Sequence, residues 1–374
     1  MEQSWHRVPG GTATAALAVA RAMAAGPDAP EQVGVAARHR HPAPAELTPP
    51  MRVRHLPLPR LALYEAWSRT SLPPVEWVTG SVDVIHGTTI IPPAGRAPIV
   101  MTVHDLAFLH EPTHFTSHGQ RLFRRSLERI RRRAAVVLCS STATMDDCAA
   151  AGLSSERLRL VPLGVSPTAP LPAETVVTAL ARLGVRGPYV LFVGTQEPRK
   201  NLPRLVQAFD EACRAGGLPT DAELVLAGPE GWGDALPAGP GNGTARHADT
   251  GSRAAMTGRW RALGRVSDAD LAALYAGALV TCQPSLREGF GLPVLEAMAH
   301  GSPVVTSRGT ATEEVAGGAA VLVDPVDSTD IARGLAEAVG RRRELVAAGL
   351  ARARVLTWVA TAERTLTAYR EVAR

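Results

Sequence analysis

The chain has 374 residues, 45% of them hydrophobic, and its 40 basic and 35 acidic side chains give a net charge of +5. This length predicts two domains, because a single hydrophobic core rarely grows beyond ~250–300 residues. The composition argues against a membrane span, a secretory signal, a disulfide framework, structural zinc and a base-stacking surface, so we expect a cytoplasmic protein with no metal site and no nucleic-acid partner.

Short apolar runs alternate with segments of helical periodicity along the N-terminal half, which predicts a parallel sheet with helices on both faces. The glycine pair at 10–11 follows a short polar segment only. A doubly wound domain usually opens with a buried strand, so we expect this first strand to be very short, absent from the chain as given, or lost to a wrong start codon. The expected helices are 12–25, 120–133 and 143–151, and the expected strands are 83–86, 99–103, 136–139 and 158–161.

His104 directly follows the apolar strand 99–103. A lone histidine is more often a structural residue than a functional one. Its place at the carboxyl end of a strand, where open α/β sheets bind ligands, favours a functional role. His86 has the same kind of position with weaker support.

The segment Arg121–Arg133 carries seven arginines. One interpretation is a solvated helix face. The alternative is a basic patch that attracts an anionic acceptor or an anionic membrane surface, which would place the protein at the inner face of the membrane as a peripheral protein.

The composition of the sequence changes after the strand at 158–161, where a stretch rich in Pro and small residues follows. We therefore expect an N-terminal domain over 1–167, a linker over 168–187 and a C-terminal domain over 188–356. Residues 357–374 are expected to form a helix that packs back on the N-terminal domain.

The second half repeats the strand–helix alternation and predicts a second doubly wound domain facing the first across a cleft. Residues 229–258 are dense in Gly, Ala and Pro, which predicts a mobile surface insertion. The expected strands are 189–193, 223–227, 279–283, 303–306 and 320–323, and the expected helices are 202–215, 268–276, 293–300, 310–315 and 328–339.

A polar turn after the buried strand 189–193 carries Arg199 and Lys200 directly before a helix. Cations at the end of a central strand suit a diphosphate. The simpler interpretation is an exposed turn with ordinary surface charges.

The stretch 285–307 predicts a strand, a glycine turn, a helix and a further strand. Gly289 and Gly291 make the turn, and the helix that follows directs its dipole and its free N–H groups at one spot, which suits a phosphate. Glu288 precedes the turn and Glu296 lies within the helix, so each is a candidate acceptor for sugar hydroxyls. A capping acid and a solvated surface acid are the structural alternatives.

These residues make the chain resemble retaining GT-B glycosyltransferases of glycosyltransferase family four, in the group that includes bacterial mannosyl- and glucosyltransferases. The resemblance covers nearly the whole chain, and the E-x7-E element is its most specific part. The matching stretches are GG at 10–11, TVHDLAFLHEP at 102–112, VPLGV at 161–165, VGTQEPRKNL at 193–202, LGRVSDADLAALYAGA at 263–278 and EGFGLPVLEAMAHGSPVV at 288–305.

The resemblance implies a role for each matching residue. Glu288 would hold hydroxyls of the transferred sugar, Glu296 the ribose, and Lys200 the diphosphate. His104 would face the donor sugar from the other domain, and Thr195 stands where many members have an arginine, whose charge we expect Arg199 to supply. The remaining donor-binding positions would be Gly11 near the phosphates, the backbone amides of Phe290, Gly291 and Leu292 at the distal phosphate, and Val266 near the base.

The expected activity is transfer of a hexose, with mannose slightly preferred, from GDP-mannose or a UDP-sugar to a glycan, lipid-linked or small-molecule acceptor with retention of configuration. Lys200, Arg199 and the helix dipole would stabilise the departing diphosphate, so we expect no cofactor and no metal requirement. The alternatives are a nucleotide-sugar epimerase on the same fold and a non-catalytic nucleotide-sugar-binding protein.

Overall fold

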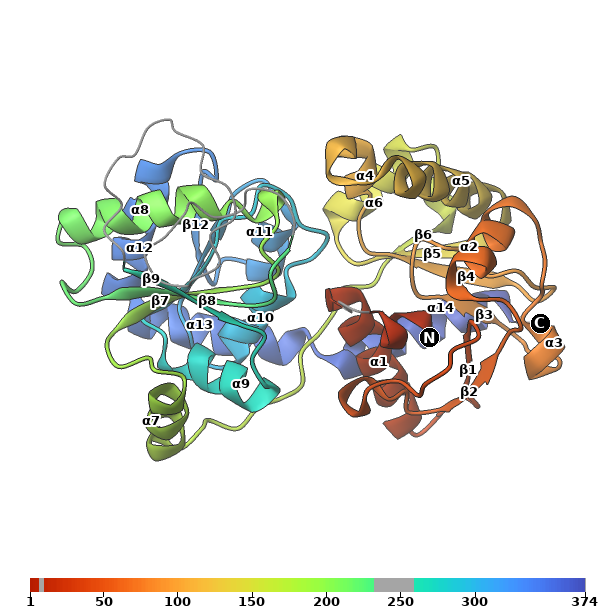
Figure 1. Ribbon diagram of the computed structural model, residues 1–374, viewed down its shortest axis with the longest axis horizontal. Helices are drawn as coiled ribbons and strands as arrows, with labels where there is room; N and C mark the ends of the chain where they lie inside the picture. The colour runs from red at the N-terminus through yellow and green to blue at the C-terminus, as the bar shows by residue number, and fades with distance from the viewer. Residues whose placement is uncertain (7–9, 232–258, 374) are drawn as a thin grey trace. The chain divides into compact units, whose positions relative to one another are not determined.

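The computed structural model describes residues 1–6, 10–231 and 259–373. The chain divides into two compact units, drawn in Figure 1. The first comprises Met1–Gly164 and Leu356–Arg374, and the second comprises Val165–Val355. Most of the insertion expected at 229–258 lies outside the described residues.

The first unit contains two parallel sheets. The larger has the order β3-β4-β5-β6, and the smaller pairs β1 with β2. The strands are β1 (Val33–Ala36), β2 (Arg52–His55), β3 (Ile85–Gly87), β4 (Ile99–Val103), β5 (Ala134–Cys139) and β6 (Leu158–Leu160). The helices are α1 (Gly10–Ala25), α2 (Arg60–Arg69), α3 (Glu76–Thr79), α4 (Ala107–His110), α5 (Ser117–Arg133), α6 (Thr142–Ala150) and α14 (Trp358–Val372), with short 3₁₀ turns η1 (Glu2–Trp5), η2 (Ala45–Leu47), η3 (Pro112–His114) and η4 (Ser155–Arg157).

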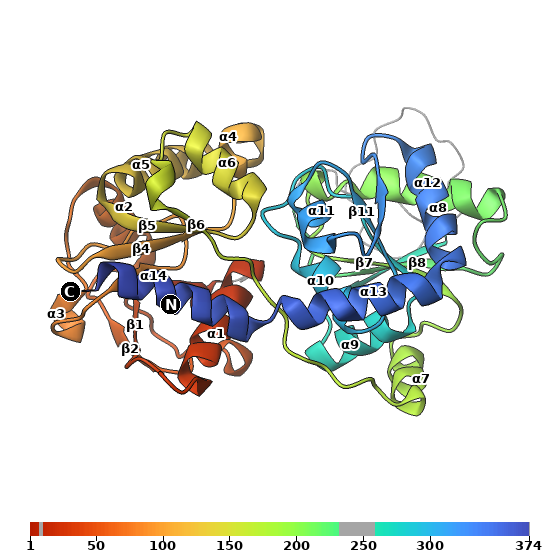
Figure 2. The same ribbon diagram turned by 180° about the vertical axis from the view of Figure 1, so that it is seen from behind.

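The strands β4 and β5 are nearly continuous apolar runs because both faces of the larger sheet are covered. On one face, Leu122 and Ile130 of α5 belong to the main core of the unit. On the other, Ala368 of α14 packs against a cluster that includes Val100 and Val136. Helix α14 also runs beside α1, as Figures 1 and 2 both show, so the C-terminal helix is part of the first unit.

The second unit has one six-stranded parallel sheet in the order β12-β11-β10-β7-β8-β9, whose first strand in the chain, β7, lies in the middle. This is the doubly wound order. The strands are β7 (Tyr189–Val193), β8 (Glu223–Ala227), β9 (Trp260–Gly264), β10 (Val280–Gln283), β11 (Val304–Ser307) and β12 (Val321–Val323). The helices are α7 (Ala173–Arg182), α8 (Leu202–Arg214), α9 (Asp268–Gly277), α10 (Leu292–Ala299), α11 (Ala311–Ala316), α12 (Ser328–Gly340) and α13 (Arg342–Val355), and η5 (Pro198–Lys200) is a 3₁₀ turn.

The expected strands and helices all occur, with β4, β7 and β8 at the expected bounds. The structure adds β1, β2 and β9, along with several helices. One of these, α7, occupies much of the stretch 168–187 expected as linker, and it packs against α9. The Pro-rich flanks of this stretch predict a loop, but the amphipathic run between them has a partner helix to cover its apolar side.

Candidate active site

The carboxyl end of β7 positions the two cations that the sequence singles out. The strand ends at Val193, and the chain then turns through η5, which contains Arg199 and Lys200. Asn201 follows with a left-handed backbone (φ 62°), and its side-chain amide donates to the carbonyls of Pro284 and Pro325 at 3.0 and 2.6 Å. This amide ties the turn to the segments after β10 and β12 and so fixes where Lys200 lies.

Lys200 is buried, with 6% of its surface exposed, and its Nζ donates to Oε1 of Glu288 at 2.5 Å. Arg199 donates to the other oxygen of the same carboxylate at 2.8 Å and to Glu197 at 2.8 Å. Ser285 Oγ donates to Glu288 Oε1 at 2.8 Å. The structure therefore brings Lys200, Arg199 and Glu288 together, with Glu288 bridging the two cations.

Burial on its own raises the pKa of Glu288, because it removes water from the charged form. The nearby charge of Lys200, followed by that of Arg199 and by hydrogen bonds from Lys200 and Ser285, outweighs this effect and lowers the pKa of Glu288 to about 2. Glu288 is thus ionised at neutral pH and holds the two cations in place.

Helix α10 begins directly after the glycine turn, and Gly291 is its N-cap. Gly291 has φ +107°, and a Cβ there would lie 2.6 Å from Cγ2 of Thr312. Both facts require glycine at this position. Pro293 occupies the first turn, where its missing N–H costs nothing, and the first N–H groups of the helix have no intrahelical acceptor. The backbone at Phe290, Gly291 and Leu292 thus forms the positive end of α10.

Glu296 lies farther along α10, where Tyr275 of α9 donates its hydroxyl to Oε2 at 2.9 Å. Burial raises the pKa of Glu296; the tyrosine hydrogen bond opposes that shift and the charge of Asp268 adds to it. The Tyr275 ring stacks on His300 with centroids 5.7 Å apart and planes 5° from parallel. Glu296 is therefore a held carboxylate and not the solvated surface acid of the structural alternative.

Thr195 and Val266 follow the carboxyl ends of two strands of the same sheet, β7 and β9. Thr195 comes directly after Gly194 at the end of β7, and Val266 comes shortly after β9. Both are half-buried. Nine of the predicted site residues thus lie in the second unit, in the segments that follow β7, β9 and β10 and in α10. They are Thr195, Arg199, Lys200, Val266, Glu288, Phe290, Gly291, Leu292 and Glu296.

The other two predicted residues, His104 and Gly11, belong to the first unit. His104 follows β4, and its carbonyl accepts from Ser140 and Thr144 at 3.1 and 3.0 Å. Burial lowers the pKa of His104, against opposing effects of Asp105 and of a hydrogen bond to the backbone of Thr88, so its imidazole is neutral at pH 7. Gly11 is exposed in the first turn of α1.

His86, the second histidine at a strand end, is held by hydrogen bonds from two sides. Its ring nitrogens lie 2.6 Å from the hydroxyl of Tyr369 and 2.7 Å from that of Thr102, and burial lowers the pKa of His86 to about 4. Both ring nitrogens of the neutral His86 therefore have hydrogen-bond partners within the first unit.

Sequence reasoning missed Asn201, Ser285 and Tyr275, whose roles depend on contacts between distant parts of the chain. One available signal was also missed. Of the 40 basic side chains, Lys200 is the only lysine in the sequence. Lysine is a compact point charge and arginine a broad fork, so a single buried lysine in an arginine-rich chain marks a place where an ammonium is needed. Within the described part of the chain, no group of three His, Cys, Asp or Glu side chains is placed to hold a metal ion.

Two family models match this chain: "Glycosyltransferase Family 4" over residues 9–169 and "Glycosyl transferases group 1" over residues 182–347. The chain is 31% identical to O-antigen chain mannosyltransferase B of Escherichia coli, covering 77% of this chain and 74% of that protein. It is 30% identical to an MMP alpha-(1->4)-mannosyltransferase of Mycolicibacterium hassiacum, covering 78% and 71%. The fold is similar to that of Anabaena Alr3699/HepE, solved in complex with UDP and glucose, with a TM-score of 0.69 at 17% identity over 97% of this chain and 96% of that one.

Proposed function

Because the chain belongs to the family-four-like glycosyltransferases with the GT-B fold, we propose that it transfers a hexose from a nucleotide-diphosphate sugar with retention of anomeric configuration. The observation that carries this proposal is the cluster of Lys200, Arg199 and Glu288 in the same unit as the N-terminus of α10. It joins two cations, a carboxylate and a helix dipole, the groups that a sugar diphosphate needs.

Lys200 and Arg199 act on the diphosphate. As the bond between the anomeric carbon and the phosphate oxygen breaks, negative charge grows on the leaving diphosphate and positive charge on the sugar. Two cations that Glu288 and Glu197 already hold in place stabilise the leaving group without reorganising. These groups supply the positive charge that the step needs, so the proposal includes no metal. Backbone N–H groups at Phe290, Gly291 and Leu292 take the distal phosphate.

Glu288 binds the transferred sugar through a hydroxyl, with the acceptor capacity that Lys200, Arg199 and Ser285 leave free, since a carboxylate offers about four acceptor sites. Glu296 binds the ribose, held by Tyr275, and Val266 lies near the base. His104, with a neutral imidazole, contacts the donor sugar, and Gly11 lies near the phosphates. Retention follows when the acceptor hydroxyl attacks from the face that the leaving group occupies, where the diphosphate oxygen accepts its proton.

Mannose from GDP-mannose is the preferred donor, because the two relatives described above are mannosyltransferases by name; the UDP complex of the structural neighbour makes a UDP-sugar the alternative. The acceptor is a glycan or a lipid-linked sugar. A thermal-shift screen of GDP-, UDP- and ADP-sugars identifies the donor, since a bound donor at 100 times its Kd stabilises by about 2.7 kcal/mol.

The decisive test is the turnover of Lys200→Ala with the donor that the screen identifies. We expect turnover to fall ~10²-fold or more, as for other lost charge-stabilising groups. Lys200→Arg keeps the charge and changes its shape, and we expect a large loss from it as well. Arg214→Ala, at the end of α8, is the control that leaves turnover unchanged. Near-normal turnover in a folded Lys200→Ala variant would remove Lys200 from the mechanism.

The same assay separates the alternatives. A transferase releases nucleoside diphosphate and forms product only when an acceptor is present. Conversion of the donor sugar to its epimer without acceptor would identify an epimerase. Tight binding of intact donor, with no release of nucleotide under any acceptor, would identify a binding protein.

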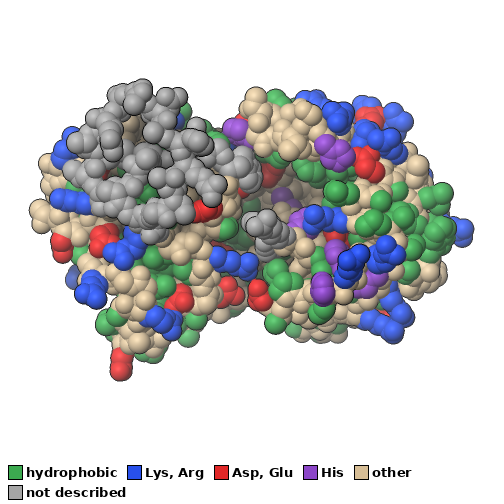
Figure 3. Space-filling view, in the orientation of Figure 1, with side chains coloured by type: hydrophobic (Ala, Val, Ile, Leu, Met, Phe, Trp, Pro, Cys, Tyr) green, Lys and Arg blue, Asp and Glu red, His purple; other side chains and the backbone are tan. Residues whose placement is uncertain are grey.

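A peripheral membrane contact through α5 is part of the proposal for the acceptor. No helix in the described residues is long and apolar enough to cross a bilayer. Figure 3 shows basic side chains gathered over α5, where Arg121, Arg124, Arg131, Arg132 and Arg133 are exposed. Glu128 pairs with two of them, and the partly buried Arg125 pairs with Glu65, so the net positive charge lies on the exposed residues.

We expect Arg121→Glu with Arg124→Glu to reduce co-sedimentation with vesicles containing anionic lipid. Each basic residue near an anionic surface contributes about 1 kcal/mol, so two reversals reduce binding by more than tenfold. Arg182→Glu, an exposed arginine of the second unit, is the matched control. Equal binding of all three proteins, or binding that does not weaken as salt rises, would show that α5 is only a solvated helix face.

A further inference from the structure

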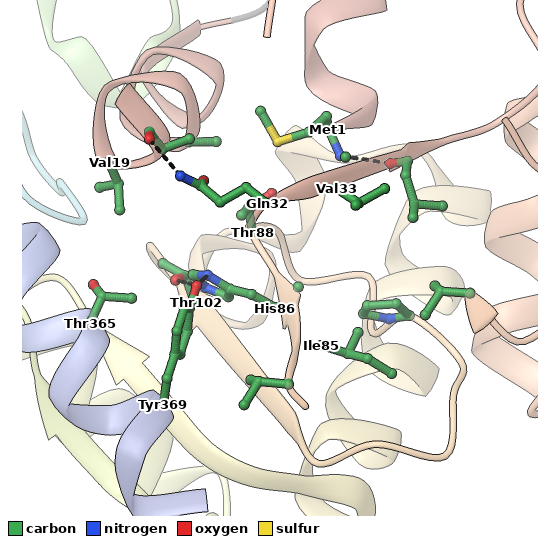
Figure 4. Close-up of a pocket in the computed structure, with 18 of the residues that line it drawn as sticks. Met1, Val19, Gln32, Val33, Ile85, His86, Thr88, Thr102, Thr365 and Tyr369 are labelled. Atoms are coloured by element: carbon green, nitrogen blue, oxygen red, sulfur yellow. Dashed lines mark hydrogen bonds between the residues drawn. The ribbon is translucent and has the colours of Figure 1, made fainter. Parts of the chain in front are cut away.

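Two hollows of the first unit differ in how their polar side chains are used. The larger, of about 560 Å³, lies beside β1 and β3, and Figure 4 shows His86 there with Thr102 and Tyr369, which bond to both nitrogens of its ring. The second hollow, of about 450 Å³, is formed by the C-terminal half of α2 and the N-terminal half of α5, and we call it the α2–α5 hollow. Its polar lining consists of Glu65, Arg69, Thr70, His118, Arg121 and Arg125.

One carboxylate arranges the cations of the α2–α5 hollow. The two oxygens of Glu65 accept from Nη2 of Arg125 at 2.9 and 2.8 Å, and Oε2 also accepts from Nε of Arg69 at 2.8 Å. Nε2 of His118 lies 3.4 Å from Oε1. Burial tends to raise the pKa of Glu65, but the hydrogen bond from Arg69 and the charges of the neighbouring basic groups lower it. Glu65 is thus ionised at neutral pH and holds arginines from two helices around one space.

The cations of the hollow outnumber its carboxylate and have unused donors. Arg121 is exposed, and among the described residues it has no hydrogen-bond or ion-pair partner. Of the three nitrogens of the Arg125 guanidinium, only Nη2 has an acceptor in the described part of the chain, and Nε is buried without one. A guanidinium has five N–H donors, so most of the donors around the hollow are available to a ligand. Three arginines against one glutamate give the hollow a net positive charge.

The arginine side chains decide which ligand the hollow attracts, because the helix dipoles oppose each other there. Helix α5 begins at Ser117 with the positive end of its dipole, and α2 ends at Arg69 with the negative end. Planar guanidinium groups bind phosphate oxygens in pairs. A phosphate monoester presents three terminal oxygens to several such groups at once, whereas a phosphodiester has two. The hollow therefore favours a phosphate monoester.

Exposed apolar side chains lie next to the hollow. Leu61 is 63% exposed and lies four residues before Glu65 on α2, so the two share a face of the helix. Leu72 is 57% exposed, and its N–H donates to Oγ1 of Thr70 at 3.2 Å. Figure 3 shows hydrophobic side chains around α2 beside the basic side chains over α5. A soluble phosphate gains nothing from these leucines, whereas a membrane presents apolar chains next to its phosphates.

We propose that the α2–α5 hollow binds the phosphate of a lipid whose headgroup ends in a phosphate monoester, while Leu61 and Leu72 enter the membrane interface beside it. This inference rests on the peripheral membrane contact of the proposed function and adds a site and a lipid class to it. Ion pairs that only tie α2 to α5 need Glu65 and Arg125, but they do not need Arg121, which bonds to neither. The exposed arginines farther along α5 attract any anionic surface, and the hollow selects among such surfaces.

The test measures binding of the full chain to vesicles by co-sedimentation. One set of vesicles contains phosphatidic acid, which is a phosphate monoester, and the other contains phosphatidylglycerol, a phosphodiester, adjusted to the same surface potential. We expect the wild-type protein to bind the phosphatidic acid vesicles on the order of tenfold more tightly, the scale of added hydrogen bonds to a charged group. Equal binding to the two sets would overturn the proposal.

Arg121 and Arg124 provide a matched pair of substitutions. Both are exposed on α5 without a partner among the residues that the structure describes, but only Arg121 lines the hollow. Loss of either charge should weaken binding to both sets of vesicles by about fivefold. Arg121→Gln should in addition abolish the preference for phosphatidic acid, whereas Arg124→Gln should keep it. The same preference in both variants would contradict a phosphate site in the hollow.

Two further measurements distinguish a lipid from a soluble phosphate. Leu72→Ser should weaken binding to phosphatidic acid vesicles severalfold and leave the binding of glycerol 3-phosphate, measured by calorimetry, unchanged. Val177→Ser, at an exposed valine of the second unit, is the control that should change neither. Unchanged vesicle binding by Leu72→Ser, or glycerol 3-phosphate bound as tightly as the vesicles, would assign the hollow to a soluble phosphate and overturn the proposal. If the wild-type protein binds no anionic vesicle, the membrane contact of the proposed function fails with it, while sugar transfer is tested separately by turnover.

Discussion

At the scale of single residues, the candidate site depends on Glu288, whose carboxylate accepts from Lys200, Arg199 and Ser285. This arrangement explains how one chain can keep two cations next to each other in a largely buried place: each cation has a charged partner before any substrate arrives. Breaking such a pair from one side is costly, because the remaining charge stays buried.

Replacing Glu288 by Gln should therefore lower the stability of the second unit at neutral pH by about 3–5 kcal/mol, the scale of a broken buried ion pair. The pKa of Glu288 is lowered to about 2, so its contribution is complete above its ordinary pKa near 4.5 and is lost as the pH falls toward 2. The difference in melting temperature between wild type and Glu288→Gln should shrink over that window. A difference that stays constant from pH 7 to pH 3 would contradict this account of the pair.

Tyr275 acts through Glu296, so Tyr275→Phe should raise the KM for the donor by about tenfold and change kcat little, as a lost hydrogen bond to a buried carboxylate predicts. Because that hydrogen bond lowers the pKa of Glu296, the variant should also lose donor affinity toward lower pH sooner than wild type does. Tyr189→Phe is the control: its hydroxyl donates to the carbonyl of Leu274 at 2.6 Å, and its loss should affect stability alone.

At the scale of elements, the glycine turn before α10 has to bring the backbone close to Thr312. Gly291→Ala adds a methyl group at a positive φ and at 2.6 Å from the Thr312 methyl. We expect a loss of about 1–3 kcal/mol in stability together with weaker binding of nucleoside diphosphate by calorimetry. Adding Thr312→Ser removes the clash and keeps the hydroxyl that bonds Thr306, so the double variant should recover part of both losses. If the double variant recovers neither stability nor nucleotide binding, the losses in Gly291→Ala come from backbone strain and not from the contact with Thr312.

The elements that the sequence predicts well are those whose own residues determine them. The strands β4, β7 and β8 are apolar runs buried on both faces, and α10 has a glycine and a proline at its start. The strand β2 reads Arg-Val-Arg-His and faces solvent, so its pattern carries no burial signal. The site shows the same division: the sequence locates Lys200 and Glu288 at strand ends, but their contact joins residues 88 positions apart and depends on the finished sheet.

At the scale of the whole molecule, the chain builds two separate cores, and the C-terminal helix α14 belongs to the first. Ala368→Asp puts a charge into the cluster that includes Val100, Val136 and Leu138, so we expect the transition of the first unit to fall by several degrees while that of the second stays. Differential scanning calorimetry distinguishes the unfolding transitions of the two units. Thr367→Asp, on the exposed side of the same helix, should change neither; an equal effect of both substitutions would contradict this packing of α14.

The central claim is that Lys200 meets the diphosphate of the donor. Reductive methylation with ¹³C-formaldehyde labels primary amines and keeps their charge, and this chain offers only Lys200 and the Met1 amine. Lys200→Arg identifies the Lys200 signal. On titration with the nucleoside diphosphate of the donor, the Lys200 signal should shift to saturation while the Met1 signal stays as an internal control. A nucleotide that binds by calorimetry but leaves the Lys200 signal unmoved would contradict the account.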